Sequence, residues 1–203
     1  MNPQRRGEET RAHILEAAEE CFARRGYDGT GVAEICRRAG VTKGGFYYHF
    51  PSKQAVFLEL LNRWLAGLDA QMEVARAGAD TVPGGLLQMA GMVRQVFEMT
   101  GGQLPIFLEF LTQAAHDQAI WQATIAPYRR YRAFFSGMIE AGIVEGTLRP
   151  VDPDVVAQVI VSMAVGLVLQ GLLDPQGADW GQVAEQGIQM LLEGLRFTEE
   201  VVK

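Results

Sequence analysis

Apolar residues recur at intervals of three and four along almost the whole chain, and this spacing most limits the folds open to it. Such intervals place side chains on one face of an α-helix. We find no convincing run of the two-residue alternation that a half-buried β-strand requires. The sequence therefore predicts an all-α protein of about nine helices.

Glycine, proline and capping residues divide this pattern into separate helices. The first predicted helix spans residues 8–25. A second begins near Thr30, which can cap it, and a third, very short helix covers residues 42–49. Ser52 can cap a long fourth helix, after which residues 77–85 are predicted to form a linker. Further helices are predicted near residues 86–100, 104–116, 118–142, 152–173 and 180–197.

The longest apolar run, VVAQVIVSMAVGLVLQGLL at residues 155–173, approaches the ~20 residues that a membrane span needs. Gln158 and Gln170 interrupt it, and its flanks carry aspartate rather than lysine or arginine. We interpret the run as a helix that is buried on two sides, by its own subunit and by a partner, and we expect no membrane association.

Charge and cysteine content favour a cytoplasmic protein with one basic segment. The N-terminus contains no apolar region of a signal peptide, and Cys21 and Cys36 are too few for a disulfide framework. Residues 1–53 carry nine Lys and Arg against seven Asp and Glu, whereas residues 54–203 have a net charge of −8. This asymmetry indicates that the N-terminal segment is the part that meets a polyanion.

Residues 30–49 have the spacing of a helix-turn-helix, with Gly40 in the turn. Phe46 and Phe50, four residues apart, are expected to anchor the third helix on the first two. Glycines at the start of a helix let backbone N–H groups approach a phosphate, while lysine, tyrosine and histidine supply further donors. The same pattern also fits a capped surface turn over a core that binds no nucleic acid. The residues left facing outward are Thr42, Lys43, Gly44, Gly45, Tyr47, Tyr48 and His49.

Residues 26–56, GYDGTGVAEICRRAGVTKGGFYYHFPSKQAV, resemble the DNA-binding domain of TetR-family (tetracycline-repressor-like) regulators. The likeness includes a threonine-led helix, an Ala-Gly-Val turn, a Thr-Lys-Gly start and an aromatic recognition helix that ends in His-Phe, and it extends over about residues 8–64. It implies a three-helix helix-turn-helix domain at residues 1–53, joined through the helix that starts at residue 52 to a helical effector-binding and dimerisation domain at residues 54–203.

The resemblance also implies which residues contact DNA. Two positions depart from the family pattern. Gly31 stands where many members have a second hydroxyl, which could remove one phosphate contact, and Gly45 stands where many have a hydroxyl or methyl side chain, which could reduce base reading. The residues expected to contact phosphates or base edges are Thr30, Thr42, Lys43, Gly44, Tyr47, Tyr48, His49 and Lys53.

Several arginines admit two interpretations. Arg5, Arg6 and Arg11 could form an arm that reaches a minor groove, or they could belong to a disordered start. The arginines at helix ends more often interact with the helix dipole than with DNA. These are Arg24, Arg25, Arg37 and Arg38.

Aromatic and methionine side chains crowd the middle of the sequence and could line a pocket for a partly apolar ligand. Gln113 or His116 could then orient the ligand, and ordinary core packing is the alternative for each residue. The residues assigned to the pocket are Trp64, Phe107, Phe110, Trp121, Ile125, Tyr128, Phe135 and Met138.

The last two predicted helices are expected to form a symmetric four-helix interface between two copies of the chain. A buried central helix in a monomer is the alternative. The small residues that would permit close approach are Ala157, Ser162, Ala164, Gly166 and Gly171.

We therefore expect a ligand-responsive transcriptional regulator, a repressor that binds a palindromic double-stranded operator as a homodimer and is released by a small effector. The chain's three histidines form no metal-binding spacing, and no nucleotide-binding or nucleophile motif occurs. We thus expect no enzyme activity, cofactor or metal. A DNA-binding regulator without a small-molecule effector and an α-helical ligand-binding enzyme are the alternatives.

Overall fold

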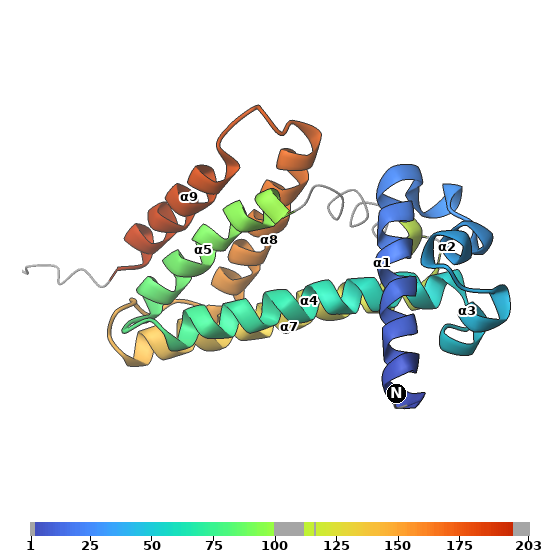
Figure 1. Ribbon diagram of the computed structural model, residues 1–203. Helices are drawn as coiled ribbons and strands as arrows, with labels where there is room; N and C mark the ends of the chain where they lie inside the picture. The colour runs from blue at the N-terminus through green and yellow to red at the C-terminus, as the bar shows by residue number, and fades with distance from the viewer. Residues whose placement is uncertain (1–2, 100–111, 116, 197–203) are drawn as a thin grey trace, which may run out of the picture. The chain divides into compact units, whose positions relative to one another are not determined.

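The computed structural model describes residues 3–99, 112–115 and 117–196 (Figure 1). Within them no strand occurs apart from an isolated bridge between Leu148 and Arg196, and the all-α prediction is confirmed. Most of the helix predicted at residues 104–116 lies outside the described residues. The helices are α1 (Pro3–Gly29), α2 (Val32–Ala39), α3 (Lys43–His49), α4 (Lys53–Ala77), α5 (Val82–Met99), α7 (Gln118–Val144), α8 (Pro153–Leu173) and α9 (Trp180–Leu195).

The chain divides into two compact units. The first contains the described residues of Met1–Gly67 and Thr100–Thr124, and the second those of Leu68–Met99 and Ile125–Lys203. Helices α4 and α7 each contribute to both units, since the division falls within them.

The first unit is built on α1, which starts earlier than the predicted residue 8. Gly26 directly follows the predicted end of this helix. It has a positive φ of 73°, so it kinks the chain before helical structure resumes as far as Gly29. The apolar face of α1 is buried and includes Ile14 and Ala18, and the ring of Phe22 packs edge-on against that of Phe57 from α4 at 5.4 Å. This aromatic contact fixes α4 to α1.

The segment between α4 and α5 is shorter than predicted. Ser52 caps α4 by accepting from the backbone N–H of Ala55 at 3.0 Å, and α4 ends at Ala77. Helix α5 then begins at Val82, because Pro83 lies in its first turn, where the missing N–H costs no hydrogen bond. The linker is therefore residues 78–81 and not 77–85.

The second unit buries one apolar core between α5, α7, α8 and α9. Helices α5 and α9 are in extensive contact, and α8 packs on both (Figure 1). Asp152 caps α8 by accepting from the N–H groups of Asp154 and Val155. Core members from the four helices include Leu86, Met89, Phe135, Ile139, Ala157, Ile160, Ile188 and Leu192.

Helix α8 has a buried face and an exposed apolar face. By length and composition alone, it is the one helix in the described part of the chain that could cross a membrane, and 33% of its most apolar window is buried inside the protein. Of the small residues predicted at a subunit interface, Ala157 belongs instead to the core of its own unit, and Gly171 is already buried within the single chain. The outward face includes Val155, Val159, Ser162, Leu169 and Leu173.

Candidate DNA-binding surface

Helices α2 and α3 form the predicted helix-turn-helix, joined by residues 40–42. Gly40 ends α2 in the left-handed conformation, with a φ of 67° that a side chain would strain. Its N–H donates to the carbonyl of Cys36, and Thr42 then caps α3. Local backbone chemistry thus sets the turn between the two helices.

Two phenylalanines hold α3 in place, as the sequence predicts. Phe46 is 0% exposed and Phe50 is 2% exposed, and their ring centroids lie 6.1 Å apart. Seven residues are too few for a helix that is stable in isolation, so this burial holds α3 in its orientation.

The opposite side of α3 faces solvent. Tyr48 is 84% exposed and Tyr47 is 53% exposed, while Lys43 and Gly44 at the start of the helix are also exposed. His49 is half-buried and packs edge-on against the Tyr48 ring at 5.0 Å. A rigid helix therefore presents phenol, ammonium and imidazole groups together on one surface.

The Thr42 hydroxyl was predicted to bind a phosphate, and in the structure it caps a helix. Its oxygen accepts from the N–H of Gly45 at 3.0 Å and caps α3. This bond uses one of the backbone donors that the glycines were expected to offer to a phosphate. The exposed hydroxyl of Thr42 can still donate its own hydrogen outward.

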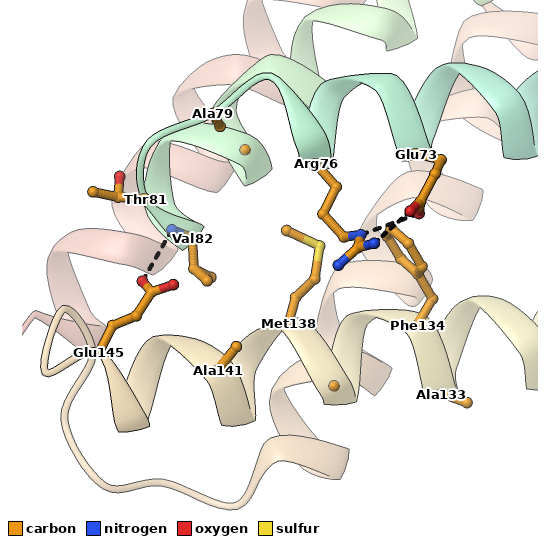
Figure 2. A pocket seen from close by; sticks show the side chains of 12 residues that line it. Glu73, Arg76, Ala79, Thr81, Val82, Ala133, Phe134, Met138, Ala141 and Glu145 are labelled. Carbon is orange, nitrogen blue, oxygen red and sulfur yellow. Dashed lines mark hydrogen bonds and ion pairs between the residues drawn. The ribbon is translucent and has the colours of Figure 1, made fainter.

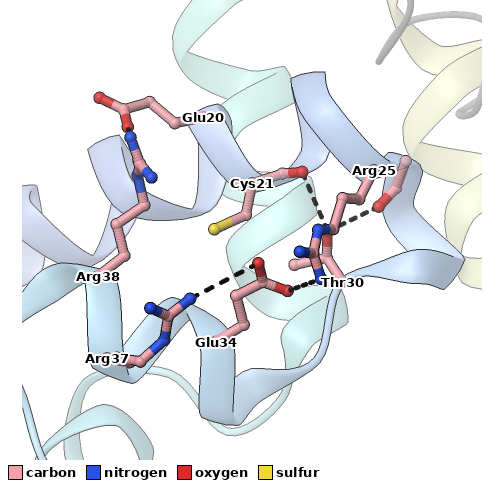
Figure 3. A network of polar contacts seen from close by, with 8 residues as sticks. Glu20, Cys21, Arg25, Thr30, Glu34, Arg37 and Arg38 are labelled. Carbon is pink, nitrogen blue, oxygen red and sulfur yellow. Dashed lines mark hydrogen bonds and ion pairs between the residues drawn. The ribbon is translucent and has the colours of Figure 1, made fainter.

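Thr30 is not the cap of α2 and is not part of the exposed surface. Its side chain is 1% exposed, and its hydroxyl is within bonding distance of the carbonyls of Gly26 (2.7 Å) and Cys21 (3.1 Å), as Figure 3 shows. Gly31 takes the capping position without a side-chain bond. The hydroxyl hydrogen of Thr30 is its only side-chain donor, and it is used by these carbonyls. Thr30 is therefore not among the residues that we propose to contact phosphates.

Lys53 also acts within the protein. Its ammonium donates to the carbonyls of Tyr27 at 2.6 Å and Thr30 at 3.0 Å, and it lies 4.0 Å from the centroid of the Tyr27 ring. These bonds tie the start of α4 to the segment that follows the kink in α1. The sequence shows a lysine at a helix start but contains no sign of these distant carbonyls.

Three of the four helix-end arginines, Arg25, Arg37 and Arg38, form ion pairs with carboxylates (Figure 3). Glu34 pairs with Arg25 at 3.4 Å and with Arg37 at 4.0 Å, and Arg38 pairs with Glu20. Two of these pairs link α1 with α2, a role that the helix-dipole interpretation did not include. Such exposed pairs contribute about 0–1 kcal/mol each, so they orient the helices more than they stabilise them.

The first turns of α1 adjoin the same surface. Arg11 binds Glu59 of α4 at 3.0 Å and lies 4.9 Å from the centroid of the Phe50 ring, so it is not a free arm. The Arg11 hydrogen bond holds the pKa of Glu59 below its usual value. Gly7 approaches the C-terminal end of α3, where a Cβ built on it would lie 3.9 Å from Cε1 of His49.

Two contacts that the sequence did not predict attach Gln113 and Asp117 to the rest of the first unit. The side chain of Gln54 donates to Asp117 at 3.1 Å, and that of Gln113 donates to Asp28 at 3.1 Å. Hydrogen bonds from backbone N–H groups, chiefly that of Ile120, hold the pKa of Asp117 below its usual value. An aspartate before a helix signals a cap, but its Gln54 partner is 63 residues away in sequence.

The residues predicted to share one ligand pocket do not all line the same space. Phe107 and Phe110 lie outside the described residues, and Trp64 and Trp121 belong to the first unit. Of those in the second unit, Met138 lines a groove of about 490 Å³ and Phe135 lines a separate cavity of about 60 Å³. Ile125 and Tyr128 are half-buried in the second unit and line neither space. Residues three apart on α7 diverge in this way because they lie about 60° apart around the helix.

Comparison with known proteins agrees with this arrangement. Residues 14–60 match the profile of bacterial regulatory proteins of the tetR family, and residues 89–196 match that of the BetI-type transcriptional repressor C-terminal domain. The A-factor receptor protein of Streptomyces griseus is 31% identical over 187 residues, which cover 91% of this chain and 63% of that protein's length.

Two solved structures share the fold across almost the whole chain. A TetR transcriptional regulator from Chloroflexus aurantiacus superposes with a TM-score of 0.81 at 24% identity, covering 96% of this chain and 100% of its own. FadR from Bacillus subtilis, solved in complex with stearoyl-CoA, has a TM-score of 0.80 at 20% identity. The match covers 91% of this chain and 99% of the FadR chain. The chain belongs to the TetR family of bacterial transcriptional regulators.

Proposed function

We propose that this regulator is a repressor that binds a palindromic operator as a homodimer and is released by a small, partly apolar effector. The observation that carries the proposal is the rigid presentation of Lys43, Tyr47 and Tyr48 on a helix held by Phe46 and Phe50. Helices of this kind enter the DNA major groove, and two copies bind half-sites one helical turn or a multiple apart.

The proposed DNA contacts are a reduced form of the predicted set. Lys43 supplies a charge to the phosphate backbone, and the tyrosines and His49 donate to phosphates or base edges. Lys53 contributes to the first unit through its carbonyl bonds, and only a rearranged side chain would reach a phosphate. The proposed surface is therefore Thr42, Lys43, Gly44, Tyr47, Tyr48 and His49.

The exposed apolar face of α8 supports the homodimer. Val155 and Leu173, at its two ends, are 58% and 74% exposed, and Met190 on the neighbouring α9 is 66% exposed. Large apolar side chains gathered on one face of two adjacent helices mark an interaction surface. A symmetric pairing of α8 and α9 would cover it, and Gly166, where a Cβ meets nothing within 4 Å, leaves room for close approach.

The cavity of about 60 Å³ in the core of the second unit supports an apolar effector. Its lining residues are all apolar, and two of them, Met89 and Met163, have the flexible side chains that let a cavity enlarge around a ligand. FadR, of the same fold, holds stearoyl-CoA. We propose that the effector enters this cavity and shifts the two recognition helices of the dimer away from half-site spacing.

Substituting Lys43 with alanine is expected to weaken binding to all duplex DNA and to reduce the slope of log affinity against log salt by about 1, because one phosphate contact is lost. Fluorescence anisotropy with an operator selected from random duplexes, at several salt concentrations, measures both. Arg132→Ala is the matched control, since it removes the same charge from an exposed site on α7 in the second unit. An unchanged slope for Lys43→Ala would remove this residue from the DNA surface.

Substituting Gly44 with alanine is expected to raise the free energy of unfolding by up to about 1 kcal/mol while lowering operator affinity. A Cβ there lies 3.8 Å from the Thr42 hydroxyl, which is ordinary contact, so the helix tolerates the methyl group. The same methyl group occupies the space into which DNA must approach. Gly67→Ala on α4, where a Cβ meets nothing within 4 Å, is expected to stabilise the protein without this loss.

Effector release is tested by titrating a metabolite panel into the operator complex. A ligand that lowers operator affinity must itself bind less tightly in the presence of operator, by the same factor. Binding of operator with no response to any ligand would favour the alternative regulator without a small-molecule effector. Equal ligand affinity with and without operator would exclude the proposed switch.

A further inference from the structure

A groove of about 490 Å³ crosses the second unit between the end of α4, the start of α5 and the C-terminal half of α7 (Figure 2). Its volume lies within the range of small-molecule sites. The inner wall is apolar and consists of Val82, Phe134 and Met138. It shares no residue with the core cavity proposed for the effector, so it is a separate space in the same unit.

Small residues open the groove down to the backbone of α7. Ala133, Gly137 and Ala141 follow one another at intervals of four, which places them on one face of the helix, and all three line the groove. A Cβ built on Gly137 meets nothing within 4 Å. The floor therefore leaves room for a ligand to lie along the helix.

The charges around the groove are unequal. Glu73 and Arg76 on α4 are three residues apart and form an ion pair, with Arg76 Nε 3.1 Å from one carboxylate oxygen, so they neutralise each other (Figure 2). Glu145 lies at the end of α7, where it accepts from the N–H of Val82 at 3.4 Å and from the hydroxyl of Thr147 at 3.3 Å. Both partners are neutral and both contacts are long.

Glu145 therefore leaves the groove with a net negative charge. The N-terminus of α5 offsets part of it, but a helix end supplies only about half a unit charge. An ammonium group would form a stronger, charge-assisted bond with this carboxylate than the two neutral donors do. Phe134, Met138 and Val82 can meanwhile cover an apolar body.

We propose that this groove binds an amphipathic organic monocation, with its ammonium group at Glu145 and its apolar part along α7 over Gly137. The site is additional to the effector cavity and to the DNA-binding surface. Its occupation does not require DNA, so it can be tested on the purified protein alone.

The test uses three probes that share one apolar body and differ in charge: 4-phenylbutylamine, 4-phenylbutanol and 4-phenylbutyrate. Isothermal titration calorimetry at pH 7 measures affinity, and the Met138 methyl signal in a methyl-labelled NMR spectrum reports the place of binding. The amine is expected to bind most tightly, the alcohol about fivefold more weakly, and the carboxylate weakest. Equal affinities, or no shift of the Met138 signal with the amine, would overturn the proposal.

Two variants test the geometry independently. Gly137→Leu fills the floor of the groove and is expected to abolish amine binding, while Glu145→Gln is expected to reduce the amine to the affinity of the alcohol. Glu140→Gln is the matched control, because it removes a carboxylate from the exposed surface of the same helix outside the groove. Amine binding that survives both Gly137→Leu and Glu145→Gln unchanged would place the ligand elsewhere and refute the site. A negative result with the three probes or with the two variants would not affect the DNA-binding and effector proposals, since neither proposal depends on this groove.

Discussion

Substituting Phe46 with alanine is expected to lower the free energy of unfolding by about 3–5 kcal/mol and to abolish operator binding. Phe46 is the buried residue of α3, and its ring packs against those of Phe50 and Tyr47 at centroid distances of 6.1 and 5.3 Å. Its removal leaves a cavity beneath a helix that has little stability of its own. Chemical denaturation and operator binding below the unfolding transition measure the two effects separately.

Tyr48→Ala on the same helix is the control for this prediction. Because Tyr48 is 84% exposed, its truncation is expected to change the unfolding free energy by less than about 0.5 kcal/mol. Operator affinity is nevertheless expected to fall, since Tyr48 is a proposed DNA contact. If Phe46→Ala retained wild-type operator affinity, α3 would not owe its position to this side chain and the proposed recognition element would be wrong.

Substituting Val159 with aspartate is expected to convert the proposed homodimer into a monomer and to lower affinity for a two-half-site operator by about 100-fold or more. Val159 lies within the exposed apolar face of α8, so a carboxylate there is tolerated in a monomer but would be buried without a partner in the dimer. Linked half-site binding supplies most of the affinity for a palindrome, and it is lost with the dimer. Sedimentation velocity gives the assembly state and anisotropy the affinity.

Val74→Asp provides the matched comparison. It introduces the same charge at an exposed valine in the second unit, on α4 rather than on α8 or α9. This variant is expected to keep both the wild-type mass in solution and the wild-type operator affinity. A Val159→Asp protein that remained dimeric would show that the interface lies elsewhere, and a wild-type monomer would contradict the homodimer directly.

The helix-turn-helix was predictable because its determinants are local. Gly40 adopts a backbone conformation that only glycine accepts without strain, and Thr42 caps the helix that follows it. Phe46 and Phe50 are four residues apart, which is enough to place them on one buried face. Each of these signals depends on neighbours within a few residues. The structure confirms the predicted glycine turn and the two buried phenylalanines, whereas the capping role of Thr42 was not predicted.

The functional assignment of polar residues was less reliable. Thr30 was expected to cap a helix and hold a phosphate, yet it is buried with its hydroxyl bonded to carbonyls of α1. Arg11, one of the residues considered for a DNA arm, is paired with Glu59, 48 residues away in sequence. Whether a donor faces DNA or the protein interior depends on which acceptors the fold brings near it. Local sequence spacing does not predict these distant acceptors.

The predicted ligand pocket also depended on contacts between residues far apart in the sequence. Aromatic and methionine residues on α7 were predicted to line a single ligand site, and the helical pattern that suggested it is present. In the second unit, however, Phe135 and Met138 line two different spaces, because neighbouring helices pack against α7 from more than one direction. Glu145, central to the proposed cation site, carried no signal in the sequence, since its place beside Val82 arises from the packing of α5 near the end of α7.

The sequence by itself determined the all-α class, the positions of most helices and the recognition helix with its buried phenylalanines, because each follows from hydrophobic period, caps and glycine turns over short distances. Only the tertiary structure decided which hydroxyls and ammonium groups are consumed by internal carbonyls, which apolar face of α8 remains uncovered, and where cavities lie. Those properties depend on contacts between residues far apart in the chain, and such contacts exist only after the helices have packed.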